Sequence, residues 1–119
     1  MPEILLVEDD TALAGGVARA VAGEGRHVTV CATAAAARQA LERPVDLVLL
    51  DVGLPDGDGL ELCREVRLAG RAPVIFLTAN DTEQDEIAGF AAGGDDYITK
   101  PFSLSVLRAR VDAMLRRAG

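Results

Sequence analysis

Polar side chains that could bind a metal ion or a phosphoryl group follow four short apolar runs of the sequence. They are Glu8 and Asp9 after the run 4–7, Asp51 after 45–50, Thr78 after 74–77 and Lys100 after 97–99. Carboxylates packed together repel one another unless a small hard cation lies among them, and Mg²⁺ prefers such oxygen ligands. An aspartate beside Mg²⁺ can attack a phosphoryl group, while an ammonium and a hydroxyl stabilise the oxygens that are transferred. These residue types therefore favour metal-assisted phosphoryl transfer to Asp51, with Lys100 as the cation and Thr78 as the hydroxyl.

The apolar runs alternate with amphipathic stretches, and this alternation predicts the elements that must position the site. Nearly continuous apolar runs are typical of parallel strands that are covered on both faces. We expect strands within 4–7, 28–31, 45–50, 74–77 and 97–99, and helices over 11–22, 34–43, 59–69, 82–93 and 104–117. Such alternation favours a parallel sheet with helices on both faces. The expected fold is a single α/β domain of the flavodoxin-like, doubly wound class, with five helices and a five-stranded sheet in the order 2-1-3-4-5.

Several helix starts carry residues that can accept a hydrogen bond from the first turn. Thr33, Asp58 and Ser103 are suited to be N-caps, and Asp81 with Gln84 resembles a capping box. The last helix has apolar residues at helical spacing, which predicts that they face the core: Leu104, Leu107, Val111 and Leu115.

The carboxyl ends of parallel strands lie at one edge of the sheet, and sites in such folds lie beyond that edge. Each polar residue alone has an ordinary structural explanation, because acidic residues after a strand commonly begin a turn or cap a helix. Their joint placement at four strand ends is what favours a functional site.

Composition limits the possible functions. The 119 residues suit one domain, and the net charge of −7 argues against direct binding of duplex DNA by this segment, which requires clustered cations. The sequence has no apolar run of the ~20 residues that span a membrane, and its start does not resemble a signal peptide. We therefore expect a cytoplasmic protein, with Cys31 and Cys63 as free thiols.

The stretches 4–10, 46–59, 77–79 and 94–102 resemble receiver domains, the phosphoacceptor modules of two-component response regulators. The resemblance covers residues 1–119. It implies that Asp51 accepts a phosphoryl group from a sensor histidine kinase. It also implies a signalling switch with slow dephosphorylation rather than an enzyme with turnover.

The resemblance assigns a role to each site residue. Mg²⁺, or Mn²⁺, would be held by Glu8, Asp9, Asp51 and the backbone carbonyl of Gly53, with Lys100 on the phosphoryl oxygens. Thr78 would bind the phosphoryl group and move inward, and Tyr97 would follow from an exposed to a buried position. The last two helices and the fifth strand would then respond, and the Lys100–Pro101 bond would be cis.

The stretches 95–103 and 115–117 resemble receivers joined to winged-helix DNA-binding domains. This implies control of transcription, with DNA bound only through an output domain that would lie beyond Gly119. It also implies a phosphorylation-dependent homodimer through the fourth helix, fifth strand and fifth helix.

The residues of that dimer surface match the subfamily in part. Asp96 and Arg110 match one ion pair of the implied interface, whereas Glu86 and Val106 depart from another. Apolar contact near Phe90 and Val106 would replace the missing pair.

The same residues leave two other functions open. One is a receiver-like interaction module that works without phosphorylation. The other is a small phosphatase of the haloacid dehalogenase type, which also uses a strand-end aspartate and Mg²⁺. Those phosphatases carry a second aspartate at the position that Gly53 occupies here.

Overall fold

Runs of consecutive apolar residues form the centre of a parallel sheet in the computed structural model, which describes residues 1–23, 25–70 and 72–118. The five strands of this sheet are β1 (Glu3–Val7), β2 (His27–Cys31), β3 (Leu47–Leu50), β6 (Val74–Thr78) and β7 (Asp96–Thr99). Their order is β2-β1-β3-β6-β7, and all neighbouring pairs are parallel. The predicted flavodoxin-like order is therefore confirmed.

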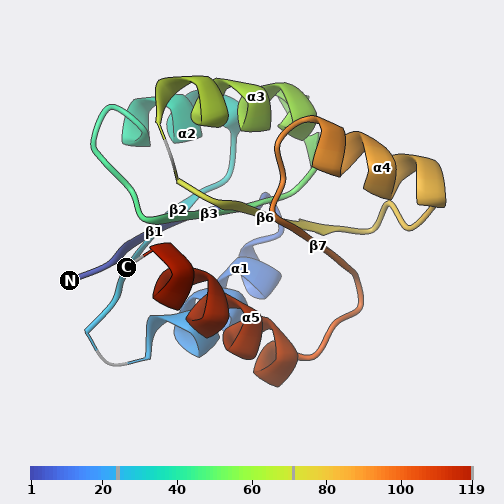
Figure 1. Ribbon diagram of the computed structural model, residues 1–119. Helices are drawn as coiled ribbons and strands as arrows, with labels where there is room; N and C mark the ends of the chain where they lie inside the picture. Colours follow the sequence, from blue (N-terminus) through green and yellow to red (C-terminus); the bar gives the residue numbers. More distant parts are fainter. Residues whose placement is uncertain (24, 71, 119) are drawn as a thin grey trace.

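Helices cover both faces of the sheet, as Figure 1 shows. On one face lie α2 (Ala34–Ala40), α3 (Gly59–Ala69) and α4 (Glu83–Ala91), and on the other lie α1 (Thr11–Ala22) and α5 (Leu104–Ala118). Successive strand residues point to opposite faces, so Leu5 joins one core cluster and Ile4 and Leu6 join the other. Burial on both faces explains why the strands are apolar without alternation.

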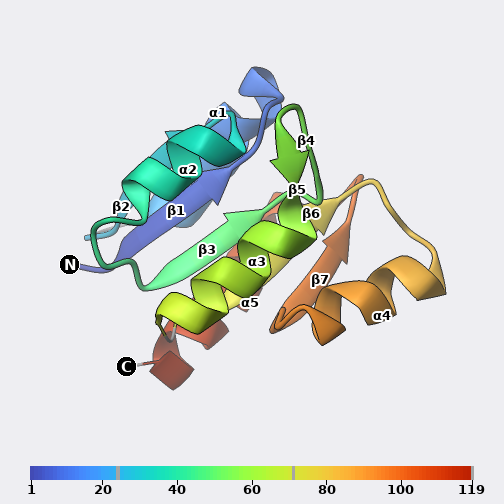
Figure 2. The ribbon, with the colours of Figure 1, turned by 90° about the horizontal axis from the view of Figure 1, so that it is seen from above.

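A small hairpin follows β3 and was not predicted as a strand pair. Its strands, β4 (Gly53–Leu54) and β5 (Gly57–Asp58), are antiparallel, and Figure 2 shows it beyond the end of β3. The sequence predicts only a turn and a helix cap there. Two-residue strands carry too few side chains to show a periodic pattern.

Several details of the helices differ from the prediction. The capping box of α4 is formed by Thr82 and Asp85 rather than by Asp81 and Gln84. Helix α2 ends at Ala40 rather than near Arg43, because the N–H groups of Glu42 and Arg43 donate to carbonyls three residues earlier and so form turns in place of helical bonds.

The predicted core face of α5 is confirmed at Leu107 and Val111, which are buried, and Leu115 packs against the same core cluster in a partly buried position. The prediction is wrong for Leu104, which is the first residue of the helix and is 41% exposed, and Met114 is buried in addition. None of the described helices is long and apolar enough to cross a membrane.

The predicted caps Thr33, Asp58 and Ser103 each accept a hydrogen bond from the first turn of their helix. Both cysteines are free, as predicted.

Candidate functional site

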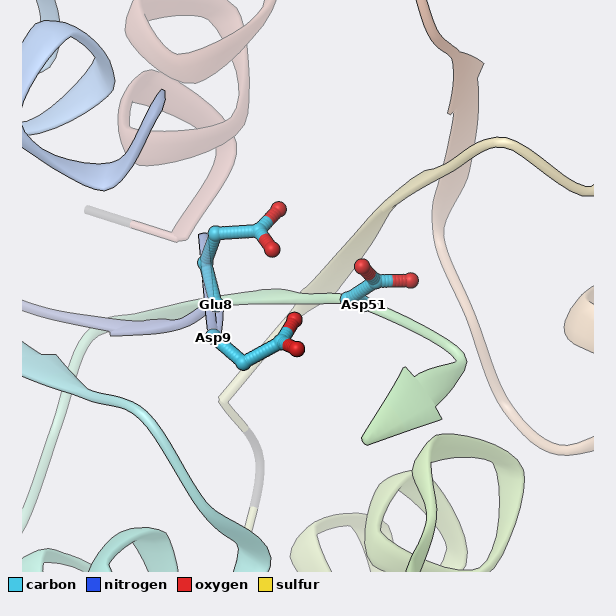
Figure 3. Close-up of side chains that lie close together, drawn as sticks. All are labelled: Glu8, Asp9 and Asp51. Atoms are coloured by element: carbon cyan, nitrogen blue, oxygen red, sulfur yellow. The ribbon is translucent and has the colours of Figure 1, made fainter. Parts of the chain in front are cut away.

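The predicted polar residues gather at the carboxyl edge of the sheet, where β1, β3, β6 and β7 end. Carboxylate oxygens of Glu8, Asp9 and Asp51 lie within 4.8 Å of one another. Figure 3 shows the three side chains directed toward a shared space. Glu8 and Asp51 are buried, at 2% and 8% exposure, and Asp9 is exposed.

Strand pairing puts two of these carboxylates side by side. Val7 is in register with Leu50 at the end of the β1–β3 pair, so the residues that follow them, Glu8 and Asp51, are neighbours. The N–H of Asp51 donates to the carbonyl of Val7 at 3.1 Å, which fixes the backbone at this point. A Cβ at Gly59 would collide with the carbonyl oxygen of Asp51, so a glycine is required where α3 begins directly behind the site.

Lys100 supplies the one ammonium within ion-pair distance of these carboxylates in the described part of the chain. Its Nζ lies 2.7 Å from Oε1 of Glu8 and 3.0 Å from Oδ2 of Asp51. Burial raises the pKa of Glu8, and the ion pair with Lys100 offsets this only in part. Burial alone would lower the pKa of Lys100, but the bonds to Glu8 and Asp51 outweigh it and raise the pKa.

The residues present fit a divalent cation. Three carboxylates share one ammonium, which leaves an excess of negative charge in a partly buried space. All the donors are hard oxygen atoms, the ligands that Mg²⁺ and Mn²⁺ bind. The arrangement can therefore hold a small cation beside a buried nucleophile, which the Lys100 ammonium also contacts.

Thr78 and Tyr97 are linked to each other through the main chain of Asn80. The N–H of Asn80 donates to Oγ1 of Thr78 at 3.1 Å, and the hydroxyl of Tyr97 donates to the carbonyl of Asn80 at 2.8 Å. Tyr97 is 8% exposed, and its ring packs against Phe76 with centroids 5.8 Å apart. Tyr97 thus occupies the buried one of the two positions that the resemblance implies.

Residues 4–112 match the sequence profile of the response regulator receiver domain. The chain belongs to this family. Receiver domains of the family switch by phosphorylation.

Proteins that are similar to the chain in sequence include transcriptional regulators. The chain is 42% identical over 118 residues to the KDP operon transcriptional regulatory protein KdpE and 48% identical over 117 residues to the transcriptional regulatory protein BasR, both of Escherichia coli K12. The matches cover 98% and 97% of this chain, but 52% and 53% of those proteins. The chain thus spans about half the length of these relatives.

Among solved structures, the BeF3-activated receiver domain of DrrB, a Thermotoga maritima OmpR/PhoB homologue, is similar with a TM-score of 0.93 and 35% identity. That match covers 98% of this chain and 99% of the DrrB domain.

A glycine of α4 makes room for Tyr97 in this receiver domain, although nothing in the sequence indicates this role. A Cβ at Gly89 would lie 2.8 Å from two ring carbons of Tyr97 and 3.3 Å from a ring carbon of Phe76. The contact joins α4 to β7, so no local pattern signals it. The Lys100–Pro101 bond is cis, as expected.

We expect Gly89→Ala to displace the ring of Tyr97 toward solvent, because contacts below about 3 Å cannot be kept. Tyr97 is the only tyrosine and the sequence has no tryptophan, so quenching of tyrosine fluorescence by acrylamide reports its exposure. Quenching should rise in Gly89→Ala. It should stay unchanged in the control Gly16→Ala, where an added Cβ meets nothing within 4 Å. Equal quenching in both variants would contradict this role of Gly89.

The residues predicted for dimerisation lie around α4, β7 and α5 of the receiver domain. Nη1 of Arg110 lies 2.9 Å from Oδ2 of Asp96 in the same chain. Phe90 and Val106 are 47% and 48% exposed, and Ile87 of α4 is exposed as well. These side chains leave apolar area uncovered.

Proposed function

We propose that Asp51 of this receiver domain accepts a phosphoryl group from a phosphohistidine of a sensor histidine kinase, in a reaction that requires Mg²⁺ or Mn²⁺. One observation carries the proposal. The buried Asp51 carboxylate shares a space with the carboxylates of Glu8 and Asp9 and lies 3.0 Å from the ammonium of Lys100. This arrangement matches what a phosphoryl acceptor needs: a cation site, a nucleophile and a fixed positive charge.

Four groups of the chain would hold the metal ion. We assign direct ligation to Asp9, Asp51 and the carbonyl of Gly53, with Glu8 acting partly through water. A bound Mg²⁺ would neutralise the negative charge of the transferred phosphoryl group. The backbone of Gly53 lies beside the Asp51 carboxylate, since the N–H of Gly53 donates to Oδ1 of Asp51 at 3.2 Å.

The chemical step follows from the side chains present. An oxygen of Asp51 attacks phosphorus, the P–N bond to the donor histidine breaks, and its electron pair returns to the imidazole nitrogen. In this structure the Lys100 ammonium pairs with Glu8 and Asp51. During the reaction it contacts a phosphoryl oxygen instead. Thr78 can donate its hydroxyl hydrogen to another, since in this structure that hydroxyl accepts from Asn80.

Phosphorylation would switch the domain through Thr78 and Tyr97. The new group adds about −1.5 to −2 charge and new acceptor oxygens. A Thr78 hydroxyl drawn to those oxygens changes its contact with Asn80, whose carbonyl holds Tyr97. The change then reaches α4, β7 and α5, which pack around Tyr97 or follow it in the chain.

We further propose that the phosphorylated domain forms a homodimer through α4, β7 and α5. The exposed Phe90 and Val106 favour apolar contact there, and Asp96 with Arg110 can exchange ion-pair partners between copies. We also propose that a DNA-binding output domain accompanies the receiver domain beyond Gly119 and that the protein controls transcription from the cytoplasm. The names of the relatives, which are about twice as long, support this.

Phe90→Asp is expected to weaken the beryllofluoride-dependent dimer at least about tenfold, because it places a charge in an apolar contact. Sedimentation velocity with Mg²⁺ and beryllofluoride measures the dimer. Leu68→Asp is the matched control, since Leu68 is 89% exposed on α3, away from this surface. A Phe90→Asp variant that dimerises like the wild type would rule out this interface.

The domain would act as a switch without turnover. A phosphatase of the haloacid dehalogenase type needs an acid near the nucleophile at the position of Gly53, which has no side chain. An interaction module independent of phosphate would not need three carboxylates and an ammonium gathered around Asp51.

Binding of beryllofluoride, a mimic of the phosphoryl group, tests the proposed function. With Mg²⁺ and beryllofluoride we expect a saturable change in Tyr97 fluorescence, and none when Mg²⁺ is omitted. Unchanged Tyr97 fluorescence at saturating concentrations of Mg²⁺ and beryllofluoride would contradict the proposal.

A further inference from the structure

The turn of the β4–β5 hairpin carries a carboxylate that binds a helix from another part of the chain. Oδ1 of Asp56 accepts a hydrogen bond from the N–H of Ala34 at 2.7 Å, and Oδ2 accepts one from Ala35 at 3.0 Å. These are the first residues of α2, whose N–H groups have no partner within the helix. Hydrogen bonds to an ionised carboxylate are stronger than neutral ones, so the hairpin is firmly held on α2.

Asp56 does not replace the ordinary cap of α2. Oγ1 of Thr33, the N-cap residue, accepts from the N–H of Ala36 at 3.1 Å. Asp56 accepts from the N–H groups of Ala34 and Ala35, which come before Ala36 in the chain. The bonds from Ala34 and then Ala35 lower the pKa of Asp56, so the carboxylate is charged at neutral pH.

Helix α2 is anchored to the rest of the domain, because Ala34 and Ala37 are buried in a core cluster. Nε and Nη2 of Arg38 each lie 2.9 Å from an oxygen of Glu65 on α3. The backbone of the turn is also close, since a Cβ at Gly57 would lie 3.4 Å from the Cβ of Ala34. The turn is therefore held on α2 by hydrogen bonds and by contact.

The other end of the same hairpin lies at the phosphoacceptor. Gly53 pairs with Asp58 and Leu54 pairs with Gly57, so a movement of the turn is carried along the hairpin to Gly53. Gly53 is exposed and has no side chain that could anchor it. Besides the hydrogen bond from its N–H to Oδ1 of Asp51 and the burial of the neighbouring Leu54, the hairpin pairing is what holds Gly53 in place.

We propose that Asp56 is a positioning residue for the metal site: its bonds to α2 hold the hairpin so that the Gly53 carbonyl faces the metal. This inference rests on the proposed function, which places a metal ligand at Gly53. It adds α2 to the elements that support the site.

The test compares Mg²⁺ binding in Asp56→Ala with the matched control Thr33→Val. Both variants remove hydrogen bonds from the start of α2, but only Asp56→Ala releases the hairpin. We expect Asp56→Ala to weaken Mg²⁺ binding about tenfold, near the low end of the effect of groups that orient metal ligands. Thr33→Val should stay within about twofold of the wild type. Calorimetric titration gives the affinity, and the amide NMR signal of Gly53 reports its response to Mg²⁺.

The outcomes separate this inference from the proposed function. Wild-type affinity in Asp56→Ala, or an equal loss in Thr33→Val, would overturn the positioning role and leave phosphorylation of Asp51 intact. A wild-type protein that does not bind Mg²⁺ would overturn both. Asp56→Asn keeps one oxygen acceptor and serves if Asp56→Ala does not fold. Asp56→Asn should then lose less Mg²⁺ affinity than is expected of Asp56→Ala. An Asp56→Asn variant that binds Mg²⁺ like the wild type would also contradict the positioning role of Asp56.

Discussion

Replacement of Asp51 by asparagine is expected to abolish phosphorylation of the receiver domain. An amide has nearly the shape of the carboxylate but cannot act as the nucleophile, and it carries no charge for the metal ion. Incubated with Mg²⁺ and acetyl phosphate, the wild type should gain the mass of one phosphoryl group, and Asp51→Asn should gain none. Intact-protein mass spectrometry measures both.

The control for this variant lies at the same edge of the sheet. Asp10 caps α1 by accepting from the N–H of Leu13, and asparagine caps helices about as well as aspartate. We therefore expect Asp10→Asn to be phosphorylated like the wild type. Phosphorylation of Asp51→Asn at the wild-type rate would mean that another carboxylate is the acceptor.

The second large effect is expected from Lys100→Met, which removes the ammonium and keeps most of the side-chain volume. Loss of one fixed contact to a transferring group typically slows a reaction about 10²–10³-fold, and we expect a similar loss in the rate of phosphorylation by acetyl phosphate. Lys100 is the only lysine of the sequence. Arg110→Met, which removes a cation paired with Asp96, should leave the rate unchanged.

Lys100→Met also changes stability, because it leaves Glu8 buried without a cation. Breaking a fully buried pair costs roughly 3–5 kcal/mol, and we expect about 2 kcal/mol because Lys100 is 22% exposed. Added Mg²⁺ should restore more stability to Lys100→Met than to the wild type, since it becomes the only positive charge in the site. Thermal unfolding with and without Mg²⁺ measures this stability. If Lys100→Met changes neither the rate of phosphorylation nor the stability of the protein, Lys100 has no part in the site.

The site could be predicted from the sequence because parallel strands impose its geometry. Continuous apolar runs mark β1, β3 and β6, and the residue that follows each of them must lie at the same edge. This alone brings Glu8, Asp51 and Thr78 to the carboxyl edge, and the structure places them there.

The supporting contacts could not be predicted, because they join residues that are distant in sequence or involve the main chain. Asp56 binds backbone groups of α2, and Asn80 links Thr78 to Tyr97 through its own backbone. A backbone group is present at every residue, so no residue type marks it. Gly89 is required only because Tyr97 approaches it from β7.

The cap of α4 shows how local signals fail by small shifts. Asp81 and Thr82 are adjacent, and both residue types cap helices well. Thr82 caps because Asp85 can return a hydrogen bond to its N–H, whereas Asp81 was predicted with Gln84. Whether Asp81 or Thr82 caps α4 changes the residue at which the helix starts, but it does not move the site.

A crystal structure of the protein with Mg²⁺ and beryllofluoride would test the central claim most directly. The account predicts the beryllium group on a carboxylate oxygen of Asp51, in contact with Thr78 and Lys100. The metal should lie among Glu8, Asp9, Asp51 and the Gly53 carbonyl. A beryllium group on any other carboxylate, or a metal outside this set of oxygens, would contradict it.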